Sequence, residues 1–277
     1  MKDGIVSEAI ERLSAAGAVE TATITGVTVG DAALLVEVAS ATDEPGRERD
    51  AGAITAGVAH RPEGPIPETS DLAVEEALEW AVSGTGSVER AVGLATLNAL
   101  SEPYVDWRRG DPMARLEDDV ECIVTVGLFA PAFRKFSDVE VRVVERVDRE
   151  LPETPPGVSV ETFTPETAPE AIEGADVVFT TGSAFVYGGV DRYIRLARSA
   201  TTVLVGATAS FLPTPAFEAG VDIVAGAVVS DRRQAGRVIA EGGCGTDLHE
   251  RGVEKVYAVC GAVEGIAASR SHRFTEP

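Results

Sequence analysis

Lysine is almost missing from this sequence, and basic residues of any kind are few. Lysine occurs only at Lys2, Lys135 and Lys255, and 24 basic residues stand against 45 acidic ones. The resulting net charge of −21 at pH 7 repels phosphate backbones and anionic lipid surfaces. Nucleic acid and membranes are therefore not expected as partners.

Cysteine is also scarce, and long apolar runs are missing. Cys122, Cys244 and Cys260 have no paired spacing, which is typical of a reducing compartment. The sequence has no run of 18 apolar residues and no signal-peptide core near its start. We therefore expect neither a membrane helix nor a secretory leader, and we expect a cytoplasmic protein.

The excess of acidic residues does not indicate disorder. Hydrophobic residues make up 44% of the chain and fall into periodic segments. An acidic surface with arginine in place of lysine is typical of proteins adapted to concentrated salt, where charges are screened over about 3 Å at 1 M. We expect a halophilic protein with an ordinary hydrophobic core.

Two domains are expected, because 277 residues is the length at which single cores begin to split. The first domain, residues 1–103, begins with an amphipathic helix. It continues with a hairpin around Gly30, a third apolar strand over 54–59, and helices over 72–82 and 88–100. This order predicts an α+β domain.

The second domain is expected over residues 120–277, after a polar linker over 104–119 that has no period. Short apolar runs alternate there with helical patterns, which predicts right-handed crossovers and a parallel sheet covered on both faces. The runs lie at 121–126, 139–145, 158–162, 176–180, 202–205, 222–225 and 255–259. This pattern indicates a Rossmann-like, doubly wound α/β domain.

The residues that follow these strands are candidate ligand contacts, because an open parallel sheet binds ligands beyond the carboxyl ends of its strands. Most of them are small or carry a hydroxyl group, which lets a ligand approach the backbone. They are Gly127, Thr181, Gly182, Ser183, Gly189, Gly206 and Ser210. The alternative is that strand-to-helix turns use such residues only for turn geometry and capping.

A nucleotide site has partial support. Glu145 ends the second predicted strand of this domain, about where a ribose-binding acid falls in dinucleotide sites. The first turn, however, has Gly127 followed by Phe129 and Pro131, so the three-glycine fingerprint is missing. An exposed carboxylate at a strand end is the alternative reading of Glu145.

No catalytic residue can be assigned from the sequence. Ser183 and Ser210 follow predicted strands, but neither lies in a G-x-S-x-G elbow. A base would have to come from His60, His249 or His272, the three histidines of the chain. Enzyme and binding protein both stay open.

Two further features concern metal and the first domain. Cys244 and His249 form a C-x4-H pair in a glycine-rich loop, which supplies two of the four ligands that zinc usually takes; a helix exit without metal is the alternative. Asn98 interrupts an apolar helix end, and a buried amide needs partners. It either caps the linker or reaches into the crevice between the domains.

Five ordered motifs carry a resemblance to a known family. They are GLATLNALS at 93–101, TTGSAFVYGGVDRYIRLARSA at 180–200, VLVGATASFLP at 203–213, GVDIVAGAVVSD at 220–231 and EGGCG at 241–245. Together they resemble the heavy-metal chelation domain family, a family of unknown function. The resemblance implies an N-terminal domain like that of enolase, joined to a Rossmann-like domain with a site in the cleft between them.

The resemblance favours a set of cleft residues. They are Asn98, Glu145, Thr181, Gly182, Ser183, Gly189, Gly206 and Ser210, with Gly127 beside them in the first turn. We expect the cleft to bind a small anionic or metal-bearing ligand, and a divalent transition metal is the cofactor class that stays open. The alternatives are an enzyme dependent on a nucleotide or S-adenosylmethionine, and a non-catalytic metal-binding protein. A homodimer stays open beside a monomer.

Overall fold

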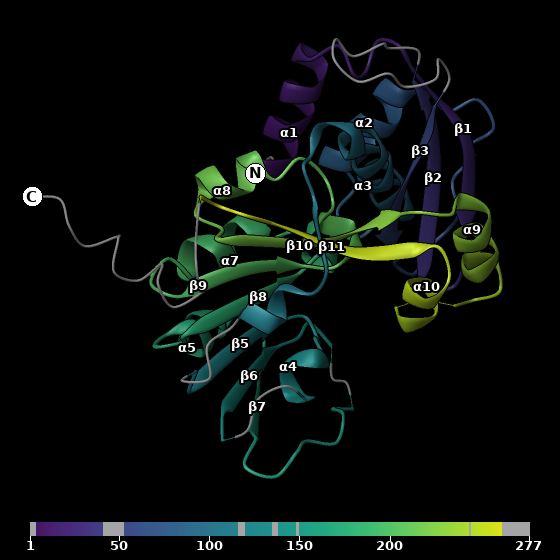
Figure 1. Ribbon diagram of the computed structural model, residues 1–277. Helices are drawn as coiled ribbons and strands as arrows, with labels where there is room; N and C mark the ends of the chain where they lie inside the picture. Colours follow the sequence, from purple (N-terminus) through teal and green to yellow (C-terminus); the bar gives the residue numbers. More distant parts are fainter. Residues whose placement is uncertain are drawn as a thin grey trace, which may run out of the picture.

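Two β-sheets organise the chain, as Figure 1 shows. The computed structural model describes residues 4–40, 53–115, 120–134, 138–147, 150–243 and 245–261. One sheet has three antiparallel strands, and the other has eight strands, most of them parallel. The predicted mixed α/β fold class is confirmed.

The first sheet is built from a hairpin and a third strand. β1 (Ala22–Val29) pairs with β2 (Ala33–Ser40), and β2 pairs with β3 (Ile54–His60), all antiparallel. Gly30 closes the hairpin by donating its N–H to the carbonyl oxygen of Ala33 at 2.9 Å. The hairpin predicted around Gly30 is therefore confirmed.

Helices cover this sheet. They are α1 (Gly4–Ala15), α2 (Val74–Val82) and α3 (Val88–Ser101), followed by the 3-10 turn η1 (Glu102–Tyr104). Ser87 caps α3 by accepting the N–H of Arg90 at 3.1 Å, which satisfies one of the free donors of the first turn. α3 lies so close to β3 that a Cβ atom on Gly57 would stand 2.1 Å from the carbonyl oxygen of Ala95. Glycine is required at that crossing.

The second sheet has the strand order β4-β11-β10-β9-β8-β5-β6-β7. Its strands are β4 (Arg108–Arg109), β5 (Cys122–Val126), β6 (Glu140–Val144), β7 (Ser159–Phe163), β8 (Val177–Thr181), β9 (Thr201–Val205), β10 (Ile223–Val229) and β11 (Val253–Val259). Strands β5 to β10 are parallel, and their order is the 3-2-1-4-5-6 order of doubly wound sheets. The order reverses between β5 and β8, where ligands bind in such sheets.

The last strand differs from the prediction of a parallel sheet. β11 runs antiparallel to β10, because α9 (Arg232–Ala240) does not cross the sheet but packs on the hairpin of the first sheet. Arg232 forms an ion pair there with Glu37 at 2.5 Å. β4 lies within the segment predicted as a linker and pairs with β11.

The two faces of the second sheet are covered differently. The remaining helices are α4 (Pro131–Arg134), α5 (Ala168–Ile172), α6 (Ser183–Tyr187), α7 (Val190–Leu196), α8 (Thr214–Ala219) and α10 (Thr246–Glu250), with the 3-10 turns η2 (Pro112–Arg115) and η3 (Ala207–Ala209). α5 and α7 pack on one face around Val124 and Val178. α4 and η2 pack on the other face around Phe179 and Val203.

The two sheets share a hydrophobic core. The largest buried cluster joins Val36 and Leu94 of the first part to Phe185, Leu204 and Phe211 of the second. The side chains of the two parts therefore pack in one cluster. The predicted division into domains at residues 103 and 120 stays a prediction. Among the described residues, no helix is long and apolar enough to cross a lipid bilayer.

Candidate functional site

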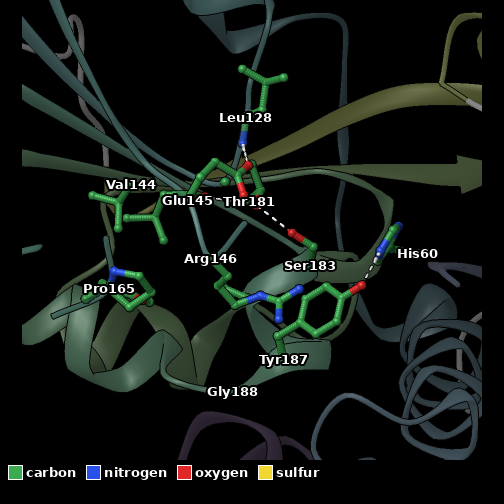
Figure 2. Close-up of a pocket in the computed structure, with 14 residues that line it drawn as sticks. His60, Leu128, Val144, Glu145, Arg146, Pro165, Thr181, Ser183, Tyr187 and Gly188 are labelled. Carbon is green, nitrogen blue, oxygen red and sulfur yellow. Dashed lines mark hydrogen bonds between the residues drawn. The ribbon is translucent and has the colours of Figure 1, made fainter. Parts of the chain in front are cut away.

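A cavity of about 210 Å³ opens at the carboxyl ends of β5, β6 and β8, where the strand order reverses. Gly127, Glu145, Thr181 and Ser183 line it, as Figure 2 shows for the last three. These residues were predicted from the rule that ligands bind beyond the carboxyl ends of strands. The structure brings the four together from three strand ends that are far apart in the sequence.

Gly127 and Thr181 bring the ends of β5 and β8 into close contact. Gly127 has a φ of +82°, and a Cβ atom on it would stand 2.2 Å from Thr181 Oγ1. Thr181 Oγ1 donates to the carbonyl oxygen of Val126 at 2.9 Å and lies 2.8 Å from Ser183 Oγ. Any side chain at position 127 would separate the two strand ends and disturb this pair of hydroxyl groups.

Glu145 holds the loop that follows β5. The N–H of Leu128 donates to Glu145 Oε1 at 2.5 Å, while the N–H of Glu145 donates to the carbonyl oxygen of Phe163 at 2.9 Å. Glu145 is half-buried and lines the cavity. Its carboxylate therefore fixes the shape of the cavity wall and also presents an acceptor to the interior.

Arg146 supplies a cation at the mouth of the cavity. Its side chain lies over the ring of Tyr187, with Cζ 3.5 Å from the ring centroid (Figure 2). The Tyr187 hydroxyl group lies 3.1 Å from Nε2 of His60, which comes from β3 of the first sheet. Stacking on an aromatic face is worth about 0.5–1 kcal/mol at an exposed site, which favours this orientation of the guanidinium.

Sequence reasoning did not single out the contact of Arg146, Tyr187 and His60. Arg146 follows Glu145 directly, and Tyr187 precedes the glycine pair at 188–189, so both lay next to predicted site residues. His60 belongs to the other sheet, and no pattern in the chain connects it to the cavity. The adjacency of Arg146 to Glu145 was the one signal that could have added a cation to the predicted site.

Tyr193 adds a buried phenol group to the wall. It is 6% exposed, and burial raises the pKa of Tyr193 above its usual value. The phenol therefore stays protonated at neutral pH. The cavity as a whole combines one cation, one carboxylate and several hydroxyl groups, and a group of this kind suits a small polar ligand.

Asn98 lies outside this cavity and ties α3 to both parts of the chain. Its Nδ2 donates to the carbonyl oxygens of Val58 on β3, at 2.9 Å, and Ala207 on η3, at 3.0 Å. Both N–H donors of its side-chain amide therefore bind backbone carbonyl oxygens. These contacts lie at the junction of the two parts, and the role of Asn98 as a cleft residue that contacts a ligand stays a prediction.

The other predicted ligand residues are distributed around the same edge of the sheet. Ser210 donates its hydroxyl group to Ala207 and accepts the N–H of Ala227. Gly182 donates its N–H to Val205 at 2.7 Å, and Gly189 precedes α7 with a φ of +93°. None of Gly182, Gly189 and Ser210 is part of the cavity wall, whereas Gly206 lines a second cavity on the same edge.

The predicted metal pair can be followed only in part, since Cys244 lies outside the described residues. His249 lines the second cavity, and burial lowers the pKa of His249. Within the described ranges no group of three or more His, Cys, Asp and Glu side chains could hold a metal ion. The described residues therefore do not fit a metal site made of protein ligands alone, which usually takes four.

Comparison with known proteins assigns the family. The DUF364 family model, described as "Putative heavy-metal chelation", matches residues 113–258, which is more than half of the chain. The chain belongs to the DUF364 family. The predicted resemblance to this family is thereby confirmed. No curated protein matches the chain.

Two solved structures of DUF364 proteins have a similar fold. One, from Pyrococcus horikoshii, is 20% identical with a TM-score of 0.73, and the match covers 92% of this chain and 100% of that one. The other, from Desulfitobacterium hafniense DCB-2, is 18% identical with a TM-score of 0.66, and the match covers 91% and 98%. Both are described as proteins of unknown function. The shared fold includes the three-stranded sheet before residue 113, while the likeness of that part to enolase stays a prediction.

Proposed function

We propose that the cavity at the ends of β5, β6 and β8 binds a small ligand with an anionic group. The observation that carries the proposal is the position of Arg146, held over Tyr187 at the cavity mouth. A chain with a net charge of −21 repels anions at long range. A guanidinium stacked at the cavity mouth supplies a local attraction, and its planar donors match the geometry of carboxylates and phosphates.

The rest of the wall would select the ligand's other groups. Thr181 and Ser183 offer hydroxyl oxygens 2.8 Å apart, and because Thr181 donates its proton to Val126, Ser183 is the hydroxyl group that can turn to donate to a ligand. Glu145 offers a carboxylate that accepts from a hydroxyl or amino group of the ligand. We therefore propose a ligand with an anionic group and at least one neutral polar group.

If a metal ion binds in this cavity, we propose that it binds as part of a chelate with the ligand. The family description points to metal chelation, but the described residues do not fit a site of protein ligands alone. A chelated metal brings most of its donors with it. Arg146 would then contact the anionic groups of the chelator, and Glu145 or His60 would add at most one or two donors.

Thermal unfolding at constant ionic strength tests the proposal, with inorganic phosphate, citrate and the nickel complex of citrate as probes. At 100 times its dissociation constant, a ligand of the native state adds about 2.7 kcal/mol. At about 2–4 °C per kcal/mol, the melting temperature should rise by about 5–10 °C. Stabilisation by nickel citrate above that by citrate would favour metal handling.

Matched arginine variants provide the control. Arg146→Gln should abolish the stabilisation, whereas Arg195→Gln, which removes the same charge from an exposed position on α7, should retain it. Equal stabilisation of both variants would refute the role of Arg146. The same holds if none of the probes raises the melting temperature.

A second candidate is an enzyme that depends on a nucleotide or S-adenosylmethionine. The position of Glu145 favours it, because an acid after the second strand of a doubly wound sheet binds ribose hydroxyl groups in dinucleotide enzymes. Adenosine, adenosine triphosphate and S-adenosylmethionine should then stabilise the wild type, and Glu145→Gln should lose that response. Failure of all three to bind would remove this candidate.

The third candidate, a non-catalytic metal-binding protein, rests on Cys244 and His249. It predicts stoichiometric bound metal that is lost in the double variant Cys244→Ser, His249→Ala. Elemental analysis of both proteins after the same metal exposure is the measurement. Unchanged metal content in the variant would exclude this pair.

We also propose that the protein is located in the cytoplasm. Both a monomer and a homodimer are considered as its oligomeric state. Cys122 is buried and Cys260 is exposed, and neither forms a disulfide. Free thiols of this kind persist in reducing compartments. Sedimentation at several protein concentrations distinguishes the two assemblies.

A further inference from the structure

A second cavity, of about 310 Å³, lies on the opposite face of the eight-stranded sheet, under α4 and η2. It lies at the carboxyl end of β9 and along the middle of β10, whereas the first cavity opens at the ends of β5, β6 and β8. At about 30 Å³ per water molecule, this space would hold about ten waters.

The walls of the second cavity combine small residues with aromatic side chains. Small residues form the floor on β10 and after β9: Gly206, Ala207, Ala225, Gly226 and Ala227. Phe179 of β8 lies beside this floor on the same face of the sheet, Met113 and Phe129 complete the lining from outside the strands, and the rings of Phe129 and Phe179 are 5.3 Å apart at an interplanar angle of 39°. A slot with a floor of small side chains and walls of aromatic and thioether groups suits a planar ring.

The rim carries one charged pair. Lys255, the one lysine in the described part of the chain, lies 3.5 Å from Asp111, and both side chains are about half exposed. An exposed pair at this distance stabilises little, so a ligand anion can replace Asp111 as the partner of Lys255 at low cost. The rim therefore complements a single negative charge on a molecule whose body is apolar.

We propose that this cavity is a second binding site, which takes a planar aromatic anion such as an aromatic carboxylate or sulfonate. The ring lies on the floor of Gly206 and Gly226, with the side chain of Phe129 against it and Phe179 at its edge. The anionic group lies at Lys255. This site is separate from the cavity at Arg146 and does not depend on the function proposed for that cavity.

Titration with 8-anilinonaphthalene-1-sulfonate, an aromatic sulfonate that fluoresces strongly in apolar surroundings, tests the proposal. The folded wild type should bind one dye molecule with saturable, blue-shifted emission. Ala225→Leu, which fills the floor, should raise the dissociation constant at least tenfold. Lys255→Gln should raise it about fivefold, and Asp111→Asn, which leaves Lys255 without its competing partner, should lower it.

The variants also distinguish binding in this cavity from binding elsewhere on the protein. Lys255 and Asp111 are half exposed, so their substitutions test the site even if Ala225→Leu disturbs folding, and circular dichroism monitors the fold of each variant. Arg146→Gln should leave dye binding unchanged. No saturable binding, unchanged affinity in Ala225→Leu and Lys255→Gln, or loss of binding in Arg146→Gln would each overturn the proposal.

Discussion

Replacing Asn98 by alanine tests how α3 holds the two sheets together. Asn98 is 3% exposed, and its Nδ2 donates to Val58 on β3 and to Ala207 on η3. These bonds span 40 and 109 residues of sequence. Alanine removes both hydrogen bonds and takes this donor from the carbonyl oxygen of Val58, whereas the carbonyl oxygen of Ala207 still accepts from the hydroxyl group of Ser210.

The expected loss follows from those two carbonyl groups. A buried acceptor left without a donor costs about 1–3 kcal/mol, which applies to Val58, and the lost hydrogen bond to Ala207 costs about 0.5–1.5 kcal/mol. Asn98 Oδ1 is itself buried without a partner, and its removal offsets part of this cost. We expect Asn98→Ala to lower the free energy of unfolding by about 1–3 kcal/mol, and the melting temperature by about 2–12 °C at about 2–4 °C per kcal/mol.

Asn98→Asp sharpens the test, because it keeps the shape of the side chain and replaces the donor by an acceptor. Two carbonyl oxygens would then face a carboxylate, so the aspartate variant should be less stable than the alanine variant at pH 7. Denaturant unfolding of both variants and the wild type in one KCl buffer is the measurement. A loss below about 0.5 kcal/mol for alanine, or an aspartate variant as stable as alanine, would refute the reasoning.

Three further predictions concern the core, a buried charge and pH. Gly57→Ala places a Cβ atom 2.1 Å from a backbone oxygen of α3 and should lower the unfolding free energy by at least about 3 kcal/mol, measured by denaturant titration. Arg90, 2% exposed, donates its Nε to the carbonyl oxygen of Phe185 at 2.6 Å; Arg90→Met should cost about 1–3 kcal/mol and increase hydrogen exchange in α6. Hydrogen bonds from Arg142 lower the pKa of Glu140, so stability present above about pH 4.3 is lost as the pH falls through the folded-state value. Glu140→Gln should flatten the melting temperature between pH 5 and 3, and an unchanged slope would contradict this.

Much of the second sheet could be predicted from the sequence. Strands such as β5 are buried at every position, so they stand out as short apolar runs between polar turns. The rule about carboxyl ends then led to Gly127, Glu145, Thr181 and Ser183, all of which line one cavity. A local pattern was sufficient because Gly127 and Glu145 directly follow β5 and β6, while Thr181 ends β8 and Ser183 stands two residues after it.

The features that the sequence did not predict depend on contacts between segments that are distant in the chain. β4 has two exposed residues, so no period distinguishes it from a linker. The direction of β11 depends on where α9 docks, and that is decided by the hairpin of the other sheet. The stack of Arg146 on Tyr187, with His60 beside it, joins three segments whose sequences carry no common signal.

The loop after β5, which the hydrogen bond from Leu128 to Glu145 holds in place, separates the two cavities. Leu128 lines one cavity, and its neighbour Phe129 lines the other. A ligand that draws the carboxylate of Glu145 to itself loosens the anchor of this loop, and the change reaches the aromatic wall on the far side. Any such effect must be mutual, because two binding events on one molecule alter each other's affinity by the same factor.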